Sequence, residues 1–247
     1  MKYVILGMAR SGTTIVSLFF HALPKSFFFF EPHYEYLNLK TTTQFKGLEK
    51  YGKFKPTTPM PVDKIISSML SSESYDMVGF KETYKGTPWK NHSYDLFNKT
   101  LLNKYKEHGY KFIYVLRNPI ESINSRVFRI TGKHFVNCPK ITVEIKRFAK
   151  NFHEFISEFM DSNSVIFFDE FIVNPKKSVT NIFPKLDVPN NIDLKYSGKK
   201  VGDQRALKSN KIESKGQKKI TLNKDYIKII KDSKGYEIYM NLRKKSS

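Results

Sequence analysis

Cysteine is nearly missing from this chain of 247 residues, which contains only Cys138. A single cysteine excludes an internal disulfide and argues against a zinc site built on cysteine ligands. No other strong metal-ligand spacing occurs, so no metal is expected. Long apolar runs are missing too. The apolar run at 14–23 is too short to cross a bilayer and contains His21, so it is not expected to be a membrane span. No secretory signal precedes the first apolar stretch, and we therefore expect a cytoplasmic protein without a membrane span.

Acidic residues are scarce: 23 Asp and Glu stand against 43 Lys and Arg, which gives a net charge of +20. Such a charge attracts anions, for example a nucleotide, an acidic glycan, nucleic acid or a membrane surface. The lysines are spread along the chain, which is equally typical of a residue used for solubility. No helix-turn-helix, RNA-binding signature or zinc finger is found, so nucleic acid is not the expected partner.

Five short, continuous apolar runs predict β-strands, and such runs are typical of a parallel sheet covered on both faces. They lie at 3–6, 27–30, 77–80, 112–116 and 165–168. Helical patterns alternate with them at 13–22, 93–107, 119–128 and 139–160, and Asn174-Pro175 opens another helix. The alternation predicts an α/β fold with a doubly wound sheet of about five strands flanked by helices.

We expect one domain over 1–247. Residues 40–61 are irregular and rich in Thr, Lys and Pro, which indicates a lid-like excursion. Residues 195–219 are rich in lysine and weakly apolar, which indicates a mobile basic loop. Residues 220–247 are expected to form a C-terminal helical extension.

The first strand runs directly into a loop bounded by Gly7 and Gly12, and the loop runs into an apolar helix. This layout is typical of a loop whose backbone N–H groups surround a phosphate at a helix N-terminus. The glycine spacing is that of a nucleotide P-loop, but Thr13 stands where a triphosphatase has its lysine. The positive charge comes earlier, at Arg10. The loop therefore fits an anionic nucleotide better than metal-assisted γ-phosphate chemistry.

In a doubly wound sheet, ligands bind beyond the carboxyl ends of the strands. Several polar residues stand at or just past these predicted strand ends and are expected to gather along one edge. They are Gly7, Glu31, Lys81, Glu82, Arg117 and Asp169. Arg117 is followed by Asn-Pro and, two helical turns later, by Ser125. An arginine fork and a hydroxyl form a suitable clamp for a phosphate monoester, although a strand-to-helix corner with an ion pair is an equal alternative.

Together these motifs resemble the sulfotransferase family that uses 3′-phosphoadenosine 5′-phosphosulfate (PAPS). The loop 10–14 is similar to its 5′-phosphosulfate loop, and Tyr114, Arg117-Asn-Pro119 and Ser125 are similar to its 3′-phosphate motif. Segment 168–171 with Asn174-Pro175 is similar to a third family element. Segment 199–203 is similar to the late loop that covers the 3′-phosphate and adenine, but lacks that loop's first glycine. The resemblance extends from residue 3 to about residue 205.

The resemblance implies a P-loop-NTPase-like three-layer sandwich, PAPS as donor, 3′-phosphoadenosine 5′-phosphate (PAP) as product, and no metal. It implies that the donor is held by Arg10, Ser11, Gly12, Thr13, Thr14, Arg117, Ser125, Lys199, Lys200 and Gly202. In-line transfer leaves negative charge on the departing nucleotide, where Arg10 and the loop N–H groups would stabilise it.

An acceptor hydroxyl also needs a base. Glu31 is favoured, because Phe30-Glu31-Pro32 is similar to a segment of carbohydrate sulfotransferases. This similarity suggests a saccharide acceptor, and the basic surface would suit an acidic glycan. Glu82 and His33 are the alternatives, and Lys81 matches a lysine of glycosaminoglycan enzymes. An ion pair with a nearby cation is the structural alternative for both carboxylates.

Two other functions stay open from the sequence. A small-molecule or nucleotide kinase on the same fold would need a loop lysine, which Thr13 denies, and an acid for Mg²⁺, which Asp169 could supply. A non-catalytic basic module that binds nucleic acid or glycan would follow from charge alone.

Overall fold

A computed structural model gives the fold, and it describes residues 1–30, 70–71, 75–84, 99–131, 139–160, 164–190, 192 and 222–246. The strands are β1 (Lys2–Met8), β2 (Ser26–Phe30), β3 (Met77–Tyr84), β4 (Lys111–Leu116) and β5 (Val165–Phe167). The main helices are α1 (Thr13–Ala22), α4 (Lys99–Glu107), α5 (Pro119–Thr131), α6 (Pro139–Glu154), α7 (Phe168–Val173), α8 (Pro175–Thr180), α9 (Lys224–Lys231) and α10 (Lys234–Ser246). A short π-helix, Phe155–Phe159, continues α6.

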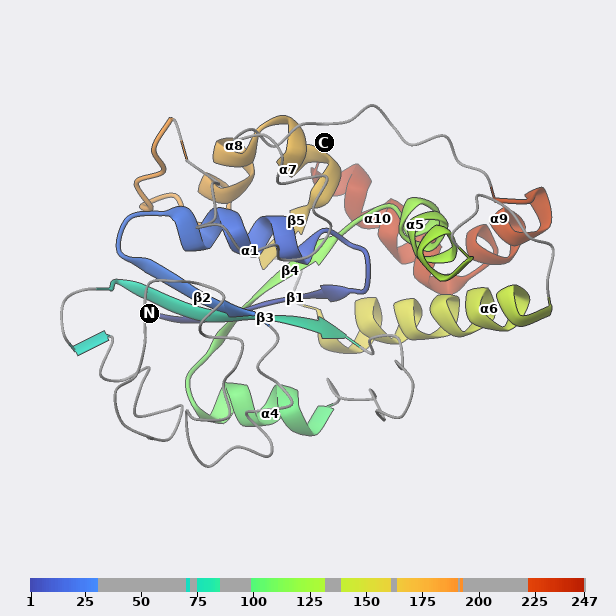
Figure 1. Ribbon diagram of the computed structural model, residues 1–247, viewed down its shortest axis with the longest axis horizontal. Helices are drawn as coiled ribbons and strands as arrows, with labels where there is room; N and C mark the ends of the chain where they lie inside the picture. Colours follow the sequence, from blue (N-terminus) through green and yellow to red (C-terminus); the bar gives the residue numbers. More distant parts are fainter. Residues whose placement is uncertain are drawn as a thin grey trace.

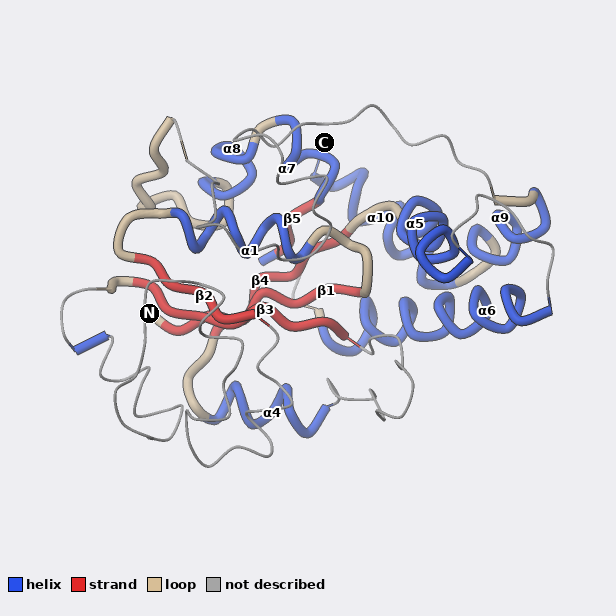
Figure 2. The backbone as a smooth tube through the Cα atoms, in the orientation of Figure 1, coloured by secondary structure: helices blue, strands red, loops and turns tan. Residues whose placement is uncertain are grey.

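The five strands form one parallel sheet in the order β2-β3-β1-β4-β5 (Figures 1 and 2). The first strand of the chain is therefore the central one. Its Leu6 lies between Glu82 of β3 and Tyr114 of β4. This central position places the loop after β1 in the middle of the sheet edge at which parallel strands end. The predicted parallel sheet is confirmed.

Helices cover both faces of the sheet. Successive side chains of each strand point to opposite faces, and the apolar side chains on each face pack against helices. Tyr3 and Ile5 of β1 pack with apolar residues of α1, α7 and α8. Val4 and Leu6 pack on the other face with apolar residues of α4, α5, α6, α9 and α10. The result is the predicted three-layer α/β sandwich of the P-loop type (Figure 1).

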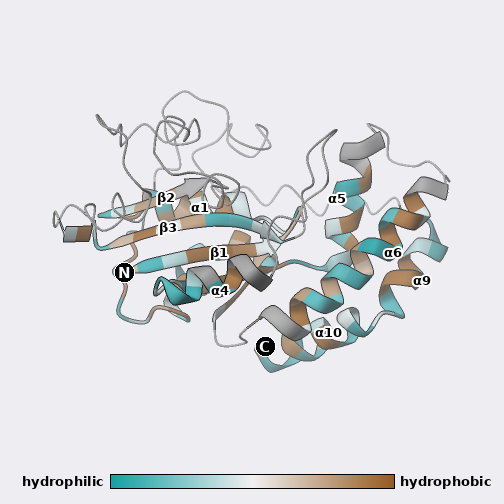
Figure 3. Ribbon diagram, turned by 90° about the horizontal axis from the view of Figure 1, so that it is seen from below, coloured by the Kyte–Doolittle hydropathy of each residue, from teal (hydrophilic) through white to brown (hydrophobic). Residues whose placement is uncertain are grey.

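The helices α5, α6, α9 and α10 lie together at the end of the sheet toward which the strands point (Figures 1 and 3). Helix α6 and the π-helix that continues it carry the apolar stripe predicted for residues 139–160. Its described members are buried: Ile145, Phe148, Phe152, Phe155 and Ile156. Helices α9 and α10, which contain the predicted C-terminal helical residues, pack against α6 and extend the same core.

Some predicted boundaries are wrong. Strand β3 does not end at Phe80 but continues to Tyr84, so that Lys81 and Glu82 lie inside the strand. The strand continues past the apolar run because Lys81 and Glu82 have hydrogen-bond partners within the fold. Phe168 does not end β5 but begins α7, a helix that the sequence reading missed.

Other boundaries are refined. Helix α5 continues past residue 128 to Thr131, and the α-helix predicted to reach residue 160 changes to the π-helix at Phe155. The helix start at Asn174 is confirmed, since its Oδ1 accepts the N–H of Lys177 at 2.9 Å. Cys138 and the stretches 40–61 and 195–219 lie outside the described residues.

Candidate functional site

The loop between β1 and α1 brings the backbone round to the N-terminus of α1. Arg10 and Gly12 both have left-handed backbone conformations, with φ of 73° and 92°. The Ser11 N–H donates to the Met8 carbonyl at 3.1 Å, which closes the turn. Helix α1 then starts at Thr13 with no acidic residue in its first turn. The first N–H groups of a helix lack partners within the helix, so this end can bind an anion.

Gly7 and Gly12 allow the loop to pack closely against the sheet. A Cβ at Gly7 would lie 2.5 Å from the Ser11 Oγ and 2.7 Å from the Val115 carbonyl oxygen. A Cβ at Gly12 would lie less than 3.0 Å from atoms of the Phe168 ring. The Ser11 Oγ is buried and has no hydrogen-bond partner among the described residues. The loop thus carries a buried hydroxyl together with N–H groups at the start of a helix.

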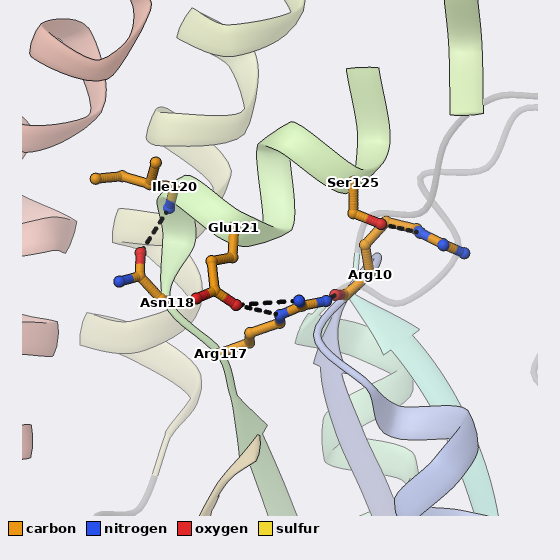
Figure 4. Close-up of polar contacts among 6 residues, drawn as sticks. All are labelled: Arg10, Arg117, Asn118, Ile120, Glu121 and Ser125. Carbon is orange, nitrogen blue, oxygen red and sulfur yellow. Dashed lines mark hydrogen bonds and ion pairs between the residues drawn. The ribbon is translucent and has the colours of Figure 1, made fainter. Parts of the chain in front are cut away.

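The two predicted phosphate motifs meet at Arg10 (Figure 4). The Arg10 Nε donates to the Ser125 Oγ at 3.1 Å, and the Arg10 carbonyl oxygen accepts from the Arg117 Nη1 at 3.4 Å. Residues 115 positions apart in the chain are therefore in direct contact. The structure thus brings together Arg10 and Ser125 with Arg117, which is one of the residues predicted to lie at the edge of the sheet.

Arg117 is held mainly by Glu121, one helical turn further along α5. Its Nε and Nη2 both donate to the Glu121 Oε2, at 3.1 Å and 3.0 Å. The guanidinium also lies over the Phe168 ring, 5.2 Å from the centroid. The N-terminus of α5 is capped by Asn118, whose Oδ1 accepts the Ile120 N–H at 2.9 Å. The ion-paired corner, which the sequence left as an equal alternative, is therefore present, and the phosphate clamp stays a prediction.

Acidic and basic groups from α7 and α10 lie behind Arg117. Burial raises the pKa of the Asp169 carboxyl above its ordinary value, and the charge of Glu121 raises this pKa further. The nearby cations Arg117 and Arg243 and a backbone hydrogen bond from Asn118 oppose that rise. Arg243 of α10 forms an ion pair with Glu170 and lies over the Phe167 ring. The C-terminal helix therefore contributes charge to the region behind the site.

Lys81 and Glu82 point to opposite faces of β3. The Lys81 Nζ donates to the Thr83 Oγ1 at 3.0 Å, on the face covered by α1. Glu82 is fully buried on the other face, where its Oε1 accepts the hydroxyl of Tyr105 at 2.8 Å. A catalytic base must reach the proton that it removes. The hydrogen bond to Tyr105 gives Glu82 a structural partner in the core. Because Lys81 and Glu82 lie on opposite faces of β3, they do not form one cluster.

Several predicted site residues lie outside the described part of the chain: Glu31, His33, Lys199, Lys200 and Gly202. Thr13 and Thr14 open α1 as predicted. Two residues near the site, Glu121 and Arg243, received no role from the sequence. The i,i+4 spacing of Arg117 and Glu121 at a helix start could have indicated their ion pair. No local signal could have indicated Arg243, which comes from a distant helix.

Comparisons with known proteins define the class of this protein. The model of the family described as the sulfotransferase domain matches residues 1–196. Since this match covers most of the chain, the protein belongs to the sulfotransferase domain family. It is therefore a transferase that moves sulfuryl groups, and neither the kinase nor the non-catalytic module receives support.

Two solved structures share the fold. One is titled "Sulfotransferase Domain from the Curacin Biosynthetic Pathway"; it has 16% identity and a TM-score of 0.57, over 92% of this chain and 95% of that chain. The other is titled "Sulfotransferase Domain from the Synechococcus PCC 7002 Olefin Synthase"; it has 15% identity and a TM-score of 0.56, over 94% of each chain. No curated protein sequence gave a significant match.

Two further findings apply to the described residues only. None of the helices there is long and apolar enough to cross a membrane. No group of three or more His, Cys, Asp or Glu side chains there is arranged to hold a metal ion.

Proposed function

We propose that this protein transfers a sulfuryl group from PAPS to an acceptor hydroxyl. The observation that carries the proposal is the contact of Arg10 with both Ser125 and Arg117, which joins the loop after β1 to the start of α5. In this arrangement the N-terminus of α1 takes the 5′-phosphosulfate, and Arg117 with Ser125 takes the 3′-phosphate. Two anionic groups of one nucleotide then occupy two adjacent cationic positions.

The reaction proceeds in line. The acceptor oxygen forms a bond to sulfur while the bond between sulfur and the bridging phosphate oxygen breaks. That oxygen leaves with the electron pair as part of PAP, and the acceptor proton passes to a base. Arg10, the Ser11 hydroxyl and the N–H groups of Thr13 and Thr14 stabilise the charge that grows on the leaving phosphate.

We assign the base to Glu31, which follows β2 directly in the chain. Glu82 is a weaker assignment, because its carboxylate is buried and accepts the Tyr105 hydroxyl. Lys81 would provide a cation near the reacting groups. Lys199, Lys200 and Gly202 would form the loop over the 3′-phosphate and adenine. The similarity around Glu31 and the net charge of +20 favour a saccharide acceptor, including an acidic one.

Nucleotide binding tests the proposal without knowledge of the acceptor. Isothermal titration calorimetry at low salt would compare PAP with adenosine 5′-phosphate, which lacks the 3′-phosphate. Arg117→Ala removes at least one charged hydrogen bond, which contributes about 1.5–3 kcal/mol, so PAP should bind at least about 10- to 150-fold more weakly. Binding of adenosine 5′-phosphate should change by less than about threefold, since Arg117 does not contact it.

Arg147→Ala is the matched control, because Arg147 is an exposed arginine of α6 that forms an ion pair with Glu144. It should leave the affinity for both nucleotides unchanged. A wild-type protein that does not bind PAP would refute the donor assignment. Equal weakening of both nucleotides by Arg117→Ala would refute the placement of the 3′-phosphate.

A further inference from the structure

The guanidinium of Arg117 is only partly used by the groups around it. A guanidinium has five N–H donors. Two of them go to the Glu121 Oε2, and a third goes to the Arg10 carbonyl oxygen. Within the described residues, two donors therefore have no hydrogen-bond acceptor. Two parallel donors are what a phosphate needs for bidentate binding.

The direction of these two donors depends on Glu121. Figure 4 shows Glu121 and the backbone of Arg10 at opposite ends of the Arg117 guanidinium. Both atoms on one side of the planar fork donate to a single carboxylate oxygen, so the plane cannot turn without breaking two hydrogen bonds. The Phe168 ring lies against the same plane. Arginine is long and flexible, and these contacts restrict it before any ligand arrives.

Other charges limit how far the anionic Glu121 would repel a phosphate. Arg117 itself neutralises Glu121 in a half-buried ion pair. Asp169 lies near both residues, and burial raises the pKa of its carboxyl, which favours the neutral form. Arg243 faces Asp169 from α10 and adds a positive charge. The carboxylates behind Arg117 are thus balanced by cations.

We propose that Glu121 is a positioning residue, which fixes the Arg117 guanidinium so that its two remaining N–H donors face the 3′-phosphate of the nucleotide. This inference rests on the proposed function and adds to it a residue that does not touch the donor itself. Preorganisation increases affinity because the binding step no longer has to order a flexible side chain. The expected contribution is about tenfold in the affinity for PAP.

The experiment uses the same two nucleotides. Glu121→Ala should weaken PAP binding about tenfold and leave adenosine 5′-phosphate binding unchanged. Glu121→Gln keeps an acceptor oxygen of the same reach, so it should recover most of the PAP affinity. Glu237→Ala is the matched control, because Glu237 is an exposed glutamate of α10. Thermal melting of each variant would show whether the fold is retained.

The outcomes separate this inference from the proposed function. If wild type does not prefer PAP over adenosine 5′-phosphate, the proposed 3′-phosphate site is wrong. If wild type shows this preference and Glu121→Ala shows it to the same degree, only the positioning role is wrong. Tighter binding of PAP by Glu121→Ala would also overturn the role, since it would make Glu121 a competitor of the phosphate.

Discussion

Gly12 is expected to be essential for two separable reasons, its backbone conformation and the lack of space beside it. Its φ of 92° is one that residues with a Cβ rarely adopt. In addition, a Cβ would lie less than 3.0 Å from the Phe168 ring. The backbone strain of an alanine in this region costs about 1–2 kcal/mol, and overpacking costs about 1–3 kcal/mol. Gly12→Ala should therefore lower the free energy of unfolding by about 2–5 kcal/mol.

Gly109 provides a matched control for the backbone part. Its φ is 76°, but no atom lies within 4 Å of the position that a Cβ would take. Gly109→Ala should therefore lose only the strain contribution of about 1–2 kcal/mol. Replacing glycine by alanine also reduces the conformational entropy of the unfolded chain. This stabilising effect is the same for both variants and cancels in the difference between their free energies of unfolding. Urea denaturation of the two variants would give that difference, which we expect to be about 1–3 kcal/mol.

Gly12→Ala should also affect the proposed nucleotide site. The Phe168 ring that meets residue 12 also lies 5.2 Å from the Arg117 guanidinium. A displaced ring moves Arg117, so Gly12→Ala should weaken PAP binding, whereas Gly109→Ala at the other end of β4 should not. In a Phe168→Leu background the clash is smaller, and the cost of Gly12→Ala should fall. If Gly12→Ala and Gly109→Ala have equal costs, the reasoning about the Phe168 contact is refuted.

Two other predictions concern acidic residues. Because the pKa of Asp169 is raised in the folded state, its contribution to stability is present below the unfolded pKa and lost as pH rises through the folded pKa. Asp169→Asn should therefore raise the free energy of unfolding at pH 7 but not near pH 4, and a difference that does not vary with pH would contradict this. Glu31→Gln should lower kcat for sulfuryl transfer to a saccharide by about 10²–10⁴ without weakening PAP binding. Glu82→Gln should retain activity, and the reverse pattern in a transfer assay would make Glu82 the base.

Local patterns in the sequence were sufficient for most of the sheet and for the centre of the site. Continuous apolar runs located all five strands, because a buried parallel strand has to be apolar on both sides. The ends of these strands then placed Gly7 and Arg117 at one edge, where the structure finds the contact between Arg10 and Arg117. The closeness of these residues could be predicted because all strands of a parallel sheet end at the same edge, whatever their order.

These local patterns did not predict the positions of polar residues whose partners are distant in the sequence. Lys81 and Glu82 looked like residues beyond a strand, because nothing local shows that Glu82 meets Tyr105 of α4 inside the core. Helix α7 was missed since it follows β5 without a turn, and its apolar residues continue the pattern of the strand.

The C-terminal helices extend this argument beyond the part of the chain that matches the family. That match ends at residue 196, yet Tyr226, Ile230 and Tyr239 belong to the same apolar core as β1 and α6. Arg243 pairs with Glu170 and lies over the Phe167 ring at the end of β5. Helix α10 therefore completes both the core and the charge balance behind Arg117. In the proposed function, the family motifs supply the groups that face the nucleotide, while residues beyond the match help to keep those groups in place.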